Sequence, residues 1–199
     1  MTGNSRINTA IFGGKFDPPH LGHQLSVFLA LEKYKFDEVW IIPSFSHPFG
    51  YHPGDFDIRI EMCGIMAQPF GKRAKVLGVE KEIGLETVYT VNLIEYLKER
   101  FPENDFSLLI GSDNWNVRDK WKNFDKIEEM CRKVVVIGRG ESKEKGFALP
   151  DISSTTIKDM LKKGENPENL LPAGIYEYIL EHGLYGTGKG KNLRFLVKA

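Results

Sequence analysis

The chain has 199 residues, of which 41% are hydrophobic, 12% aromatic and 27% charged. This length fits a single domain, and the apolar content is sufficient for a buried core, which excludes wholesale disorder and fibrous repeats. The 27 Lys and Arg residues balance the 27 Asp and Glu residues, so no global field holds duplex nucleic acid or an anionic membrane. Any binding of phosphate groups must depend on local features.

The cysteines and the N-terminal residues indicate a soluble, cytoplasmic protein. Cys63 and Cys131 lie far apart and outside any C-x-x-C or metal-ligand spacing, and the apolar neighbours of Cys63 favour a buried thiol over a reactive one. Free thiols fit a reducing compartment. Residues 1–10 lack the pattern of a signal peptide, and no apolar stretch approaches the roughly 20 residues that span a bilayer. We therefore expect no membrane and no nucleic acid among the partners.

Short β-rich segments alternate with longer amphipathic ones over the first two thirds of the chain. The predicted strands cover residues 8–12, 38–43, 74–79, 107–110 and 133–137, and apolar residues recur at helical spacing over 21–29, 57–67 and 88–98. Strands joined by crossover helices form a parallel sheet. The right-handed rule for crossovers then predicts an α/β fold with an open, doubly wound, five-stranded parallel sheet of the Rossmann-like type, whose ligands bind beyond the carboxyl ends of the strands.

The remainder of the chain predicts a small C-terminal helical part. A loop at 138–146 precedes two predicted helices at 154–163 and 172–182. Ser153 or Ser154 can cap the first helix, and Pro172 suits the first turn of the second. We expect residues 1–185 to form one domain and the basic, glycine-rich residues 186–199 to form a tail; fraying, an added edge strand and contact with a partner all stay open for this tail.

The segment GGKFDPPHLGH, residues 13–23, follows the first predicted strand and opens the first helix. Gly13 and Gly14 allow a ligand to approach the backbone, and Asp17, Pro18 and Pro19 turn the chain. The helix start offers free N–H groups and a positive dipole end to an anion. His20 and His23 would share one face there and can donate hydrogen bonds to phosphate oxygens.

A structural turn with two surface histidines is the alternative interpretation of this segment. However, the six fixed residues of G-x-F-x-P-x-H-x-G-H should coincide by chance less than about once in a million positions. A zinc site is a weaker alternative, because no further cysteine or carboxylate–histidine set stands at a familiar ligand spacing. The pattern therefore favours a phosphate-binding turn.

A second segment, DISSTTIK at residues 151–158, brings hydroxyls and N–H groups to the start of another predicted helix, and Lys158 adds a positive charge. Alone, such a segment is typical of a helix cap. Together the two segments resemble the H-x-G-H and I-S-S-T-x-x-R signatures of a nucleotidylyltransferase superfamily. The resemblance implies that the second segment lies over the ATP phosphates. Lys158 stands where that superfamily usually has arginine, so it supplies charge without a bidentate fork.

Further segments resemble the branch of this superfamily that adenylates nicotinate or nicotinamide mononucleotide, and this resemblance covers most of residues 7–185. LIGSD at 109–113 is similar to that branch's strand-four signature. Trp121 is similar to the tryptophan that stacks on the pyridine ring, although the nearby Trp115 could take its place and core packing is the alternative for both. Tyr89 and Thr90 resemble a pair whose backbone contacts the pyridine substituent.

The resemblance implies a complete set of site residues. The catalytic residues are His20, His23 and Lys158. The ATP-binding residues are Gly13, Gly14, Phe16, Gly111, Asp113, Arg139, Ile152, Ser153, Ser154 and Thr155. The mononucleotide-binding residues are Lys15, Ser44, His47, Tyr89, Thr90 and Trp121.

Departures from that branch leave selectivity between acid and amide open. Val88 and Asn92 replace a serine and an aspartate around the tyrosine–threonine pair. The substrate loop 43–51 usually carries a basic residue after a proline pair, whereas here His47 precedes Pro48 and Tyr51 lies near the usual lysine position. Arg59, in the stretch RIEM, is either a charge on a helix face or a ligand. The closing helix is expected to pack in the core through Tyr176, Ile179 and Leu180.

The implied reaction is attack of the mononucleotide phosphate on the α-phosphorus of ATP, which gives a dinucleotide and pyrophosphate in NAD biosynthesis. No general base is needed, because the attacking phosphate is already anionic near neutral pH and catalysis rests on positioning and charge neutralisation. His20 is assigned to the α and bridging oxygens, His23 to the pyrophosphate or triphosphate, and Lys158 to the β and γ phosphates. Mg²⁺ is expected as cofactor, held mainly by phosphates rather than by a protein metal site.

Two alternative functions stay open at this stage. The protein could transfer AMP or CMP to another phosphate, such as phosphopantetheine or phosphocholine, since such enzymes share the two phosphate signatures. It could also be a non-catalytic nucleotide sensor or partner-binding module, which the departures at Lys158, Asn92 and 43–51 would explain. The sequence leaves the oligomeric state open and is compatible with a homo-oligomer.

Overall fold

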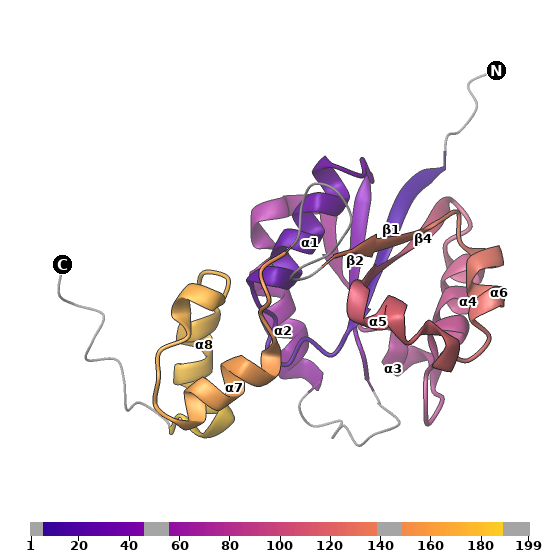
Figure 1. The fold of residues 1–199 in the computed structure, drawn as a ribbon. Helices are drawn as coiled ribbons and strands as arrows, with labels where there is room; N and C mark the ends of the chain where they lie inside the picture. The colour runs from indigo at the N-terminus through magenta and orange to yellow at the C-terminus, as the bar shows by residue number, and fades with distance from the viewer. Residues whose placement is uncertain (1–5, 46–55, 139–148, 189–199) are drawn as a thin grey trace.

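The computed structural model describes residues 6–45, 56–138 and 149–188, and five parallel strands form its centre (Figure 1). The strands lie in the order β3-β2-β1-β4-β5. Their bounds are β1 Ile7–Gly14, β2 Glu38–Pro43, β3 Ala74–Val76, β4 Asn104–Gly111 and β5 Val134–Ile137. Strand order reverses beside β1, which pairs with both β2 and β4, and this reversal is where open α/β sheets bind ligands. The predicted open, parallel, five-stranded sheet is confirmed.

Helices cover both faces of the sheet (Figure 1). The α-helices are α1 Leu21–Glu32, α2 Phe56–Ala67, α3 Val79–Ile83, α4 Thr90–Arg100, α5 Ser112–Asn116, α6 Phe124–Met130, α7 Ser154–Lys162 and α8 Ile175–His182. Short 3₁₀ helices occupy η2 Gln68–Arg73, η3 Arg118–Lys120, η4 Glu168–Leu170 and η5 Leu184–Gly186.

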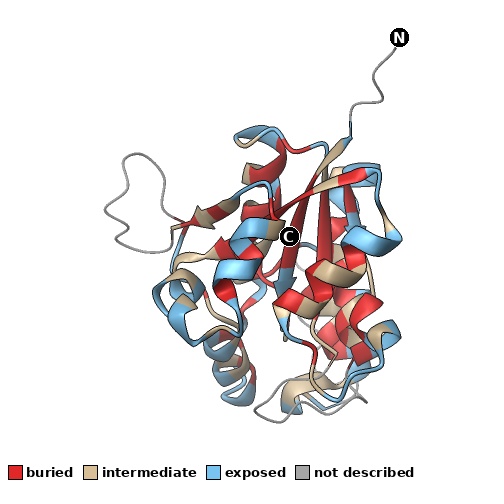
Figure 2. Cartoon of the chain, turned by 90° about the vertical axis from the view of Figure 1, so that its right-hand side faces the viewer, coloured by how far each residue is buried: buried red, intermediate tan, exposed pale blue. Residues whose placement is uncertain are grey.

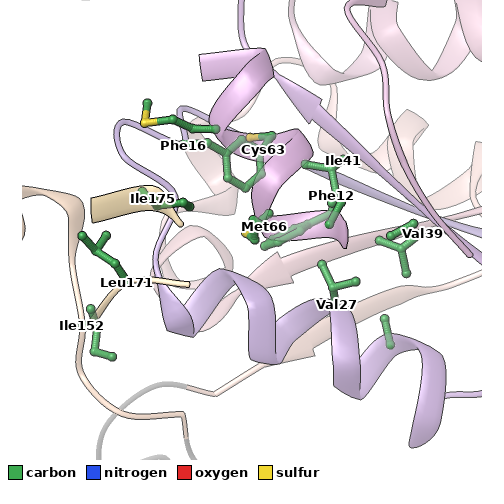
Figure 3. Packing of buried hydrophobic residues seen from close by; sticks show 14 of the residues in the cluster. Phe12, Phe16, Val27, Val39, Ile41, Cys63, Met66, Ile152, Leu171 and Ile175 are labelled. Atoms are coloured by element: carbon green, nitrogen blue, oxygen red, sulfur yellow. The ribbon is translucent and has the colours of Figure 1, made fainter. Parts of the chain in front are cut away.

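Alternating strand residues supply two separate hydrophobic cores. On β1, Ala10 and Phe12 join the core under α1, α2, α7 and α8, whereas Ile11 joins the core under α4 and α6. Successive side chains of a strand point to opposite faces, so a strand covered on both sides is apolar along most of its length. Figure 2 shows this as buried strands between helices that are exposed on their outer sides. Figure 3 shows part of the first core, including Phe12, Val27 and Met66.

Several predicted element boundaries differ from those of the structure. The strand predicted at 107–110 is longer and runs from Asn104 to Gly111. The strand predicted at 74–79 ends at Val76; Leu77 still donates to the Ile41 carbonyl, and Gly78 then caps α3, which begins at Val79. Helix α8 begins at Ile175 rather than at Pro172, because Gly174 adopts a left-handed backbone with φ of 86° just before it. By contrast, α7 has the predicted Ser153 cap, whose hydroxyl accepts from the Thr156 N–H at 3.1 Å.

The cysteines and the closing helix behave as the sequence predicts. Cys63 and Cys131 are both buried and unbridged, and burial raises the pKa of each thiol, that of Cys131 to about 11. The buried side chains of α8 are Ile175, Tyr176, Ile179 and Leu180. None of the helices in the described ranges combines the length and apolar content that crossing a membrane requires.

Candidate active site

The turn between β1 and α1 stacks the two predicted catalytic histidines against each other. His20 caps α1 and is 1% exposed, and its ring lies 3.7 Å from that of His23, centroid to centroid, at an interplanar angle of 28°. The His20 N–H donates to Nδ1 of His23 at 3.2 Å. A nitrogen that accepts this bond carries no proton, so the neutral His23 ring has its proton on Nε2. That N–H is therefore a donor, which is the state that a phosphate oxygen requires.

Fixed residues of the G-x-F-x-P-x-H-x-G-H pattern pack against one another to hold this pair. A Cβ on Gly22 would lie 3.0 Å from Cε1 and Nδ1 of His20, so a side chain at this position would press on the ring. Phe16 is 1% exposed and its ring contacts that of His23 edge-on at 4.9 Å. A Cβ on Gly14 would in turn lie 3.2 Å from the Phe16 ring. The Phe16 side chain, which the resemblance assigns to ATP, thus packs beneath His23.

Helix α7 lies on this turn although it is remote in the sequence. The Ser154 hydroxyl donates to the Pro18 carbonyl at 2.8 Å across 136 residues, and the Lys158 ammonium pairs with Asp17 at 2.8 Å across 141 residues. The other Asp17 oxygen accepts from the Tyr185 hydroxyl at 2.7 Å. The structure thus brings the two predicted phosphate segments together. Asp17, the partner of Lys158, lies three residues before His20 in the chain.

A pocket of about 740 Å³ opens at the carboxyl ends of β1 and β4 and beside Ser44, which follows β2, on the side of the sheet that α4 and α6 cover. Its lining includes all five of the predicted mononucleotide residues that the structure describes. These are Lys15, Ser44, Tyr89, Thr90 and Trp121, and the predicted ATP residues Gly13 and Gly14 join them. Residues from four separate parts of the sequence therefore meet in one cavity.

The pocket distinguishes the two candidate tryptophans. Trp121 lines it, and its ring is supported edge-on by Phe124 at a centroid distance of 5.9 Å. Trp115 does not line the pocket, and the Arg118 guanidinium lies over its ring, 4.2 Å from the centroid. Of the two tryptophans, Trp121 is therefore the one that can offer an aromatic face to a ligand in this cavity.

The charged groups of the pocket lining are mostly cationic. They are Lys15, Lys120, Lys122 and Glu80. Although the chain is neutral overall, three ammonium groups and one carboxylate give this cavity a local positive field, which suits an anionic ligand. Burial raises the pKa of Glu80 to about 7, against the opposing effects of the Phe45 N–H and the Arg59 guanidinium.

Arg59 belongs to neither of the two roles considered from the sequence. It is 1% exposed on α2, and it donates to the Lys15 carbonyl at 2.9 Å and to the Ser44 carbonyl at 2.7 Å. It therefore ties together the segments that follow β1 and β2. Sequence reasoning also overlooked Glu80 and treated Asp17 only as a turn residue.

The remaining predicted ATP residues lie in different environments. Gly111 caps α5 at the end of β4, and Asp113 is exposed in the first turn of that helix, where its neighbour Asn114 lines the pocket. Ile152 is buried in the core, whereas Thr155 is exposed on α7. His47 and Arg139 lie outside the described residues. Within the described part of the chain, no three His, Cys, Asp or Glu side chains gather to hold a metal ion.

The fold and the paired phosphate segments define a nucleotidylyltransferase, and residues 11–160 match the family described as "Cytidylyltransferase-like". The chain is 37% identical over 182 residues to the "Probable nicotinate-nucleotide adenylyltransferase" of Myxococcus xanthus, covering 90% of this chain and 95% of that protein. It is 35% identical over 188 residues to the protein of the same name from Anaeromyxobacter sp. (strain K), and the match covers 93% of this chain and 99% of that protein. The chain belongs to the nicotinate-nucleotide adenylyltransferase family.

Solved structures support the fold. The Plasmodium falciparum nicotinic acid mononucleotide adenylyltransferase complexed with NaAD superposes with a TM-score of 0.75, over 91% of this chain and 98% of that chain. At 19% identity, this similarity is evidence for the arrangement of sheet and helices alone.

Proposed function

We propose that this protein transfers the adenylyl group of ATP to nicotinate mononucleotide, forming the dinucleotide and releasing pyrophosphate in NAD biosynthesis. The observation that carries the proposal is the pocket in which Lys15, Ser44, Tyr89, Thr90 and Trp121 meet beside the phosphate-binding turn. The names of the relatives favour the nicotinate form. The lysine-rich lining supports the same choice, because nicotinate carries a carboxylate that the amide lacks.

The phosphate of the mononucleotide attacks the α-phosphorus while pyrophosphate leaves on the opposite side. Trp121 holds the pyridine ring, and Tyr89 and Thr90 hold its substituent. His20 donates to the α and bridging oxygens and His23 to the departing pyrophosphate, whose negative charge grows in the transition state. The reaction needs no proton acceptor on the protein.

Lys158 neutralises the β and γ phosphates in this proposal. An ammonium has three N–H donors, so Lys158 can keep its bond to Asp17 and still donate to phosphate oxygens. The bond to Asp17 restricts the rotamers of the long Lys158 side chain. This restriction partly compensates for the loss of the planar, two-donor guanidinium of the arginine that is usual at this position. Ser153, Ser154 and the N-terminus of α7 bind the same part of the triphosphate.

Mg²⁺ accompanies ATP in this proposal and neutralises charge on the phosphates. Such an ion would be held chiefly by phosphate oxygens and water. Asp113, at the carboxyl end of β4, is the carboxylate assigned to the ribose or to a metal-bound water. The free cysteines support a cytoplasmic location.

Pyrophosphate release by the purified protein tests this function. The protein is incubated with ATP, Mg²⁺ and one of four acceptors: nicotinate mononucleotide, nicotinamide mononucleotide, phosphopantetheine or phosphocholine. The proposal predicts the highest kcat/KM with nicotinate mononucleotide. Release with phosphopantetheine or phosphocholine alone would identify a different transferase, and ATP binding without release on any acceptor would identify a sensor.

A further inference from the structure

One peptide group beside the pocket is bound at both ends by charged side chains. This is the peptide that joins Ser44 to Phe45, immediately after β2. Its carbonyl accepts from Nη2 of Arg59 at 2.7 Å, and its N–H donates to Oε2 of Glu80 at 2.8 Å. The preceding peptide is fixed as well, because the Ser44 N–H donates to the Gly14 carbonyl at 2.9 Å.

Both charged side chains are deeply buried, which makes the arrangement costly. Glu80 is 6% exposed and Arg59 is 1% exposed, and they come from different helices, α3 and α2. Burying charge is unfavourable, and a pair of apolar residues of similar volume often stabilises a fold as well or better. Core packing therefore does not account for these two side chains. What they uniquely provide is a donor and an acceptor at defined positions on one peptide group.

The fixed peptide adjoins the wall of the pocket. Glu80 and Ser44 line the cavity together with Lys15, whose carbonyl accepts the second Arg59 bond at 2.9 Å. On the phosphate side, Lys158 pairs with Asp17 at 2.8 Å, and neither of these two residues lines the pocket. Displacement of the Ser44–Phe45 peptide should therefore disturb the pocket while leaving Lys158 in place.

We propose that Glu80, acting with Arg59, is a positioning residue for the mononucleotide: it fixes the Ser44–Phe45 peptide and thereby the wall formed by Lys15 and Ser44. Glu80 acts through this backbone and touches no reacting atom. The inference rests on the proposed function only for the identity of the acceptor.

The test compares three variants of the full chain by steady-state pyrophosphate release, with KM measured separately for each substrate. Glu80→Ala removes the acceptor and should raise the KM for nicotinate mononucleotide about tenfold or more, the scale of losing one hydrogen bond to a charged group. Its KM for ATP should stay within twofold. Glu80→Gln keeps an oxygen that accepts the Phe45 N–H and should recover most of the loss.

Glu82→Ala is the matched control, because Glu82 is an exposed residue of the same helix and accepts from the Tyr96 hydroxyl instead. It should leave both KM values within twofold. Glu80→Leu keeps the buried volume without an acceptor, and it replaces Glu80→Ala if that variant does not fold. An unchanged KM for the mononucleotide, or an equal rise in both KM values, would overturn the proposal.

Failure of the proposed function would be visible in the unmodified protein. If that protein releases no pyrophosphate with nicotinate mononucleotide, the same comparison is made with the phosphate acceptor that it does use. In Glu80→Ala, the KM for that acceptor is then still expected to rise while the KM for ATP stays within twofold. For a protein that binds ATP without turnover, calorimetric titration of nicotinate mononucleotide into the same variants gives the corresponding Kd values, and equal affinities would again overturn the positioning role.

Discussion

Substitution of Gly22 by alanine should separate catalysis from stability. The added Cβ would lie 3.0 Å from two atoms of the His20 ring, whereas carbon contacts are favourable at about 3.5–4.0 Å, so the ring must move by roughly 0.5 Å. His20 is buried and stacked on His23 at 3.7 Å, so the movement disturbs both imidazoles. A misplacement of about 1 Å can cost about 10²-fold in rate. We therefore expect kcat to fall roughly tenfold.

The same substitution should change the free energy of unfolding little. Alanine is favoured over glycine inside a helix by about 0.5–1 kcal/mol, which offsets part of the steric cost at His20. Pyrophosphate release gives kcat, and urea denaturation gives the free energy of unfolding. Gly64→Ala on α2 is the control, because a Cβ there meets nothing within 4 Å; it should keep kcat and gain about 0.5–1 kcal/mol. A Gly22→Ala protein with kcat within twofold of normal would refute the packing argument.

Three further substitutions test the pocket, the lysine and the buried carboxylate. Trp121→Ala should raise the KM for nicotinate mononucleotide about three- to tenfold, the scale of one aromatic stacking contact, while Trp115→Ala leaves it within twofold; equal effects in steady-state assays would contradict the assignment. Lys158→Ala should lower kcat/KM for ATP roughly tenfold or more, and Lys158→Arg should restore it, because arginine keeps the positive charge. An arginine variant as slow as the alanine variant would argue against a role for the charge. Burial raises the pKa of Glu80 from 4.5 to about 7, so its stabilising contribution is full below pH 4.5 and is lost as pH rises through 7. Between pH 5 and pH 8, denaturation should show the unmodified protein losing about 2 kcal/mol relative to Glu80→Gln; a constant difference would mean that Glu80 ionises normally in the folded protein.

The sheet could be predicted because the strands are short and apolar and three of the four connections between them carry a helical periodicity; α5 and α6, between β4 and β5, were not predicted. The pattern failed where local residues allow either structure. Val79 is β-branched and apolar, so it extended the predicted strand, but Gly78 redirects the chain and Val79 starts α3. At α8 the preference of proline for a first turn placed the start at Pro172, whereas the left-handed backbone of Gly174 delays it to Ile175.

The packing of the turn between β1 and α1 was predictable because its parts are contiguous: Gly14, Phe16, His20, Gly22 and His23 pack within a single short segment. Their roles toward ATP stay predictions.

Arg59 and Glu80 were not predictable in the same way. Their partners are backbone groups of Lys15, Ser44 and Phe45, which lie 44, 15 and 35 residues away along the chain. Backbone groups have no signature in a sequence. Asp17 was overlooked for a related reason, because its ion pair with Lys158 exists only once α7 has docked on the first turn.

Transfer of label from ATP tests the central claim most directly. The protein is mixed with α-³²P-labelled ATP, Mg²⁺ and nicotinate mononucleotide, and the products are separated and counted, with His20→Ala run beside it. We predict that the label enters nicotinate adenine dinucleotide in a one-to-one ratio with pyrophosphate, and that the variant is slower by roughly 10²-fold. Label that remains in ATP, or that leaves it without forming the dinucleotide, would contradict adenylyl transfer, and an equally fast variant would contradict the role of the stacked histidines.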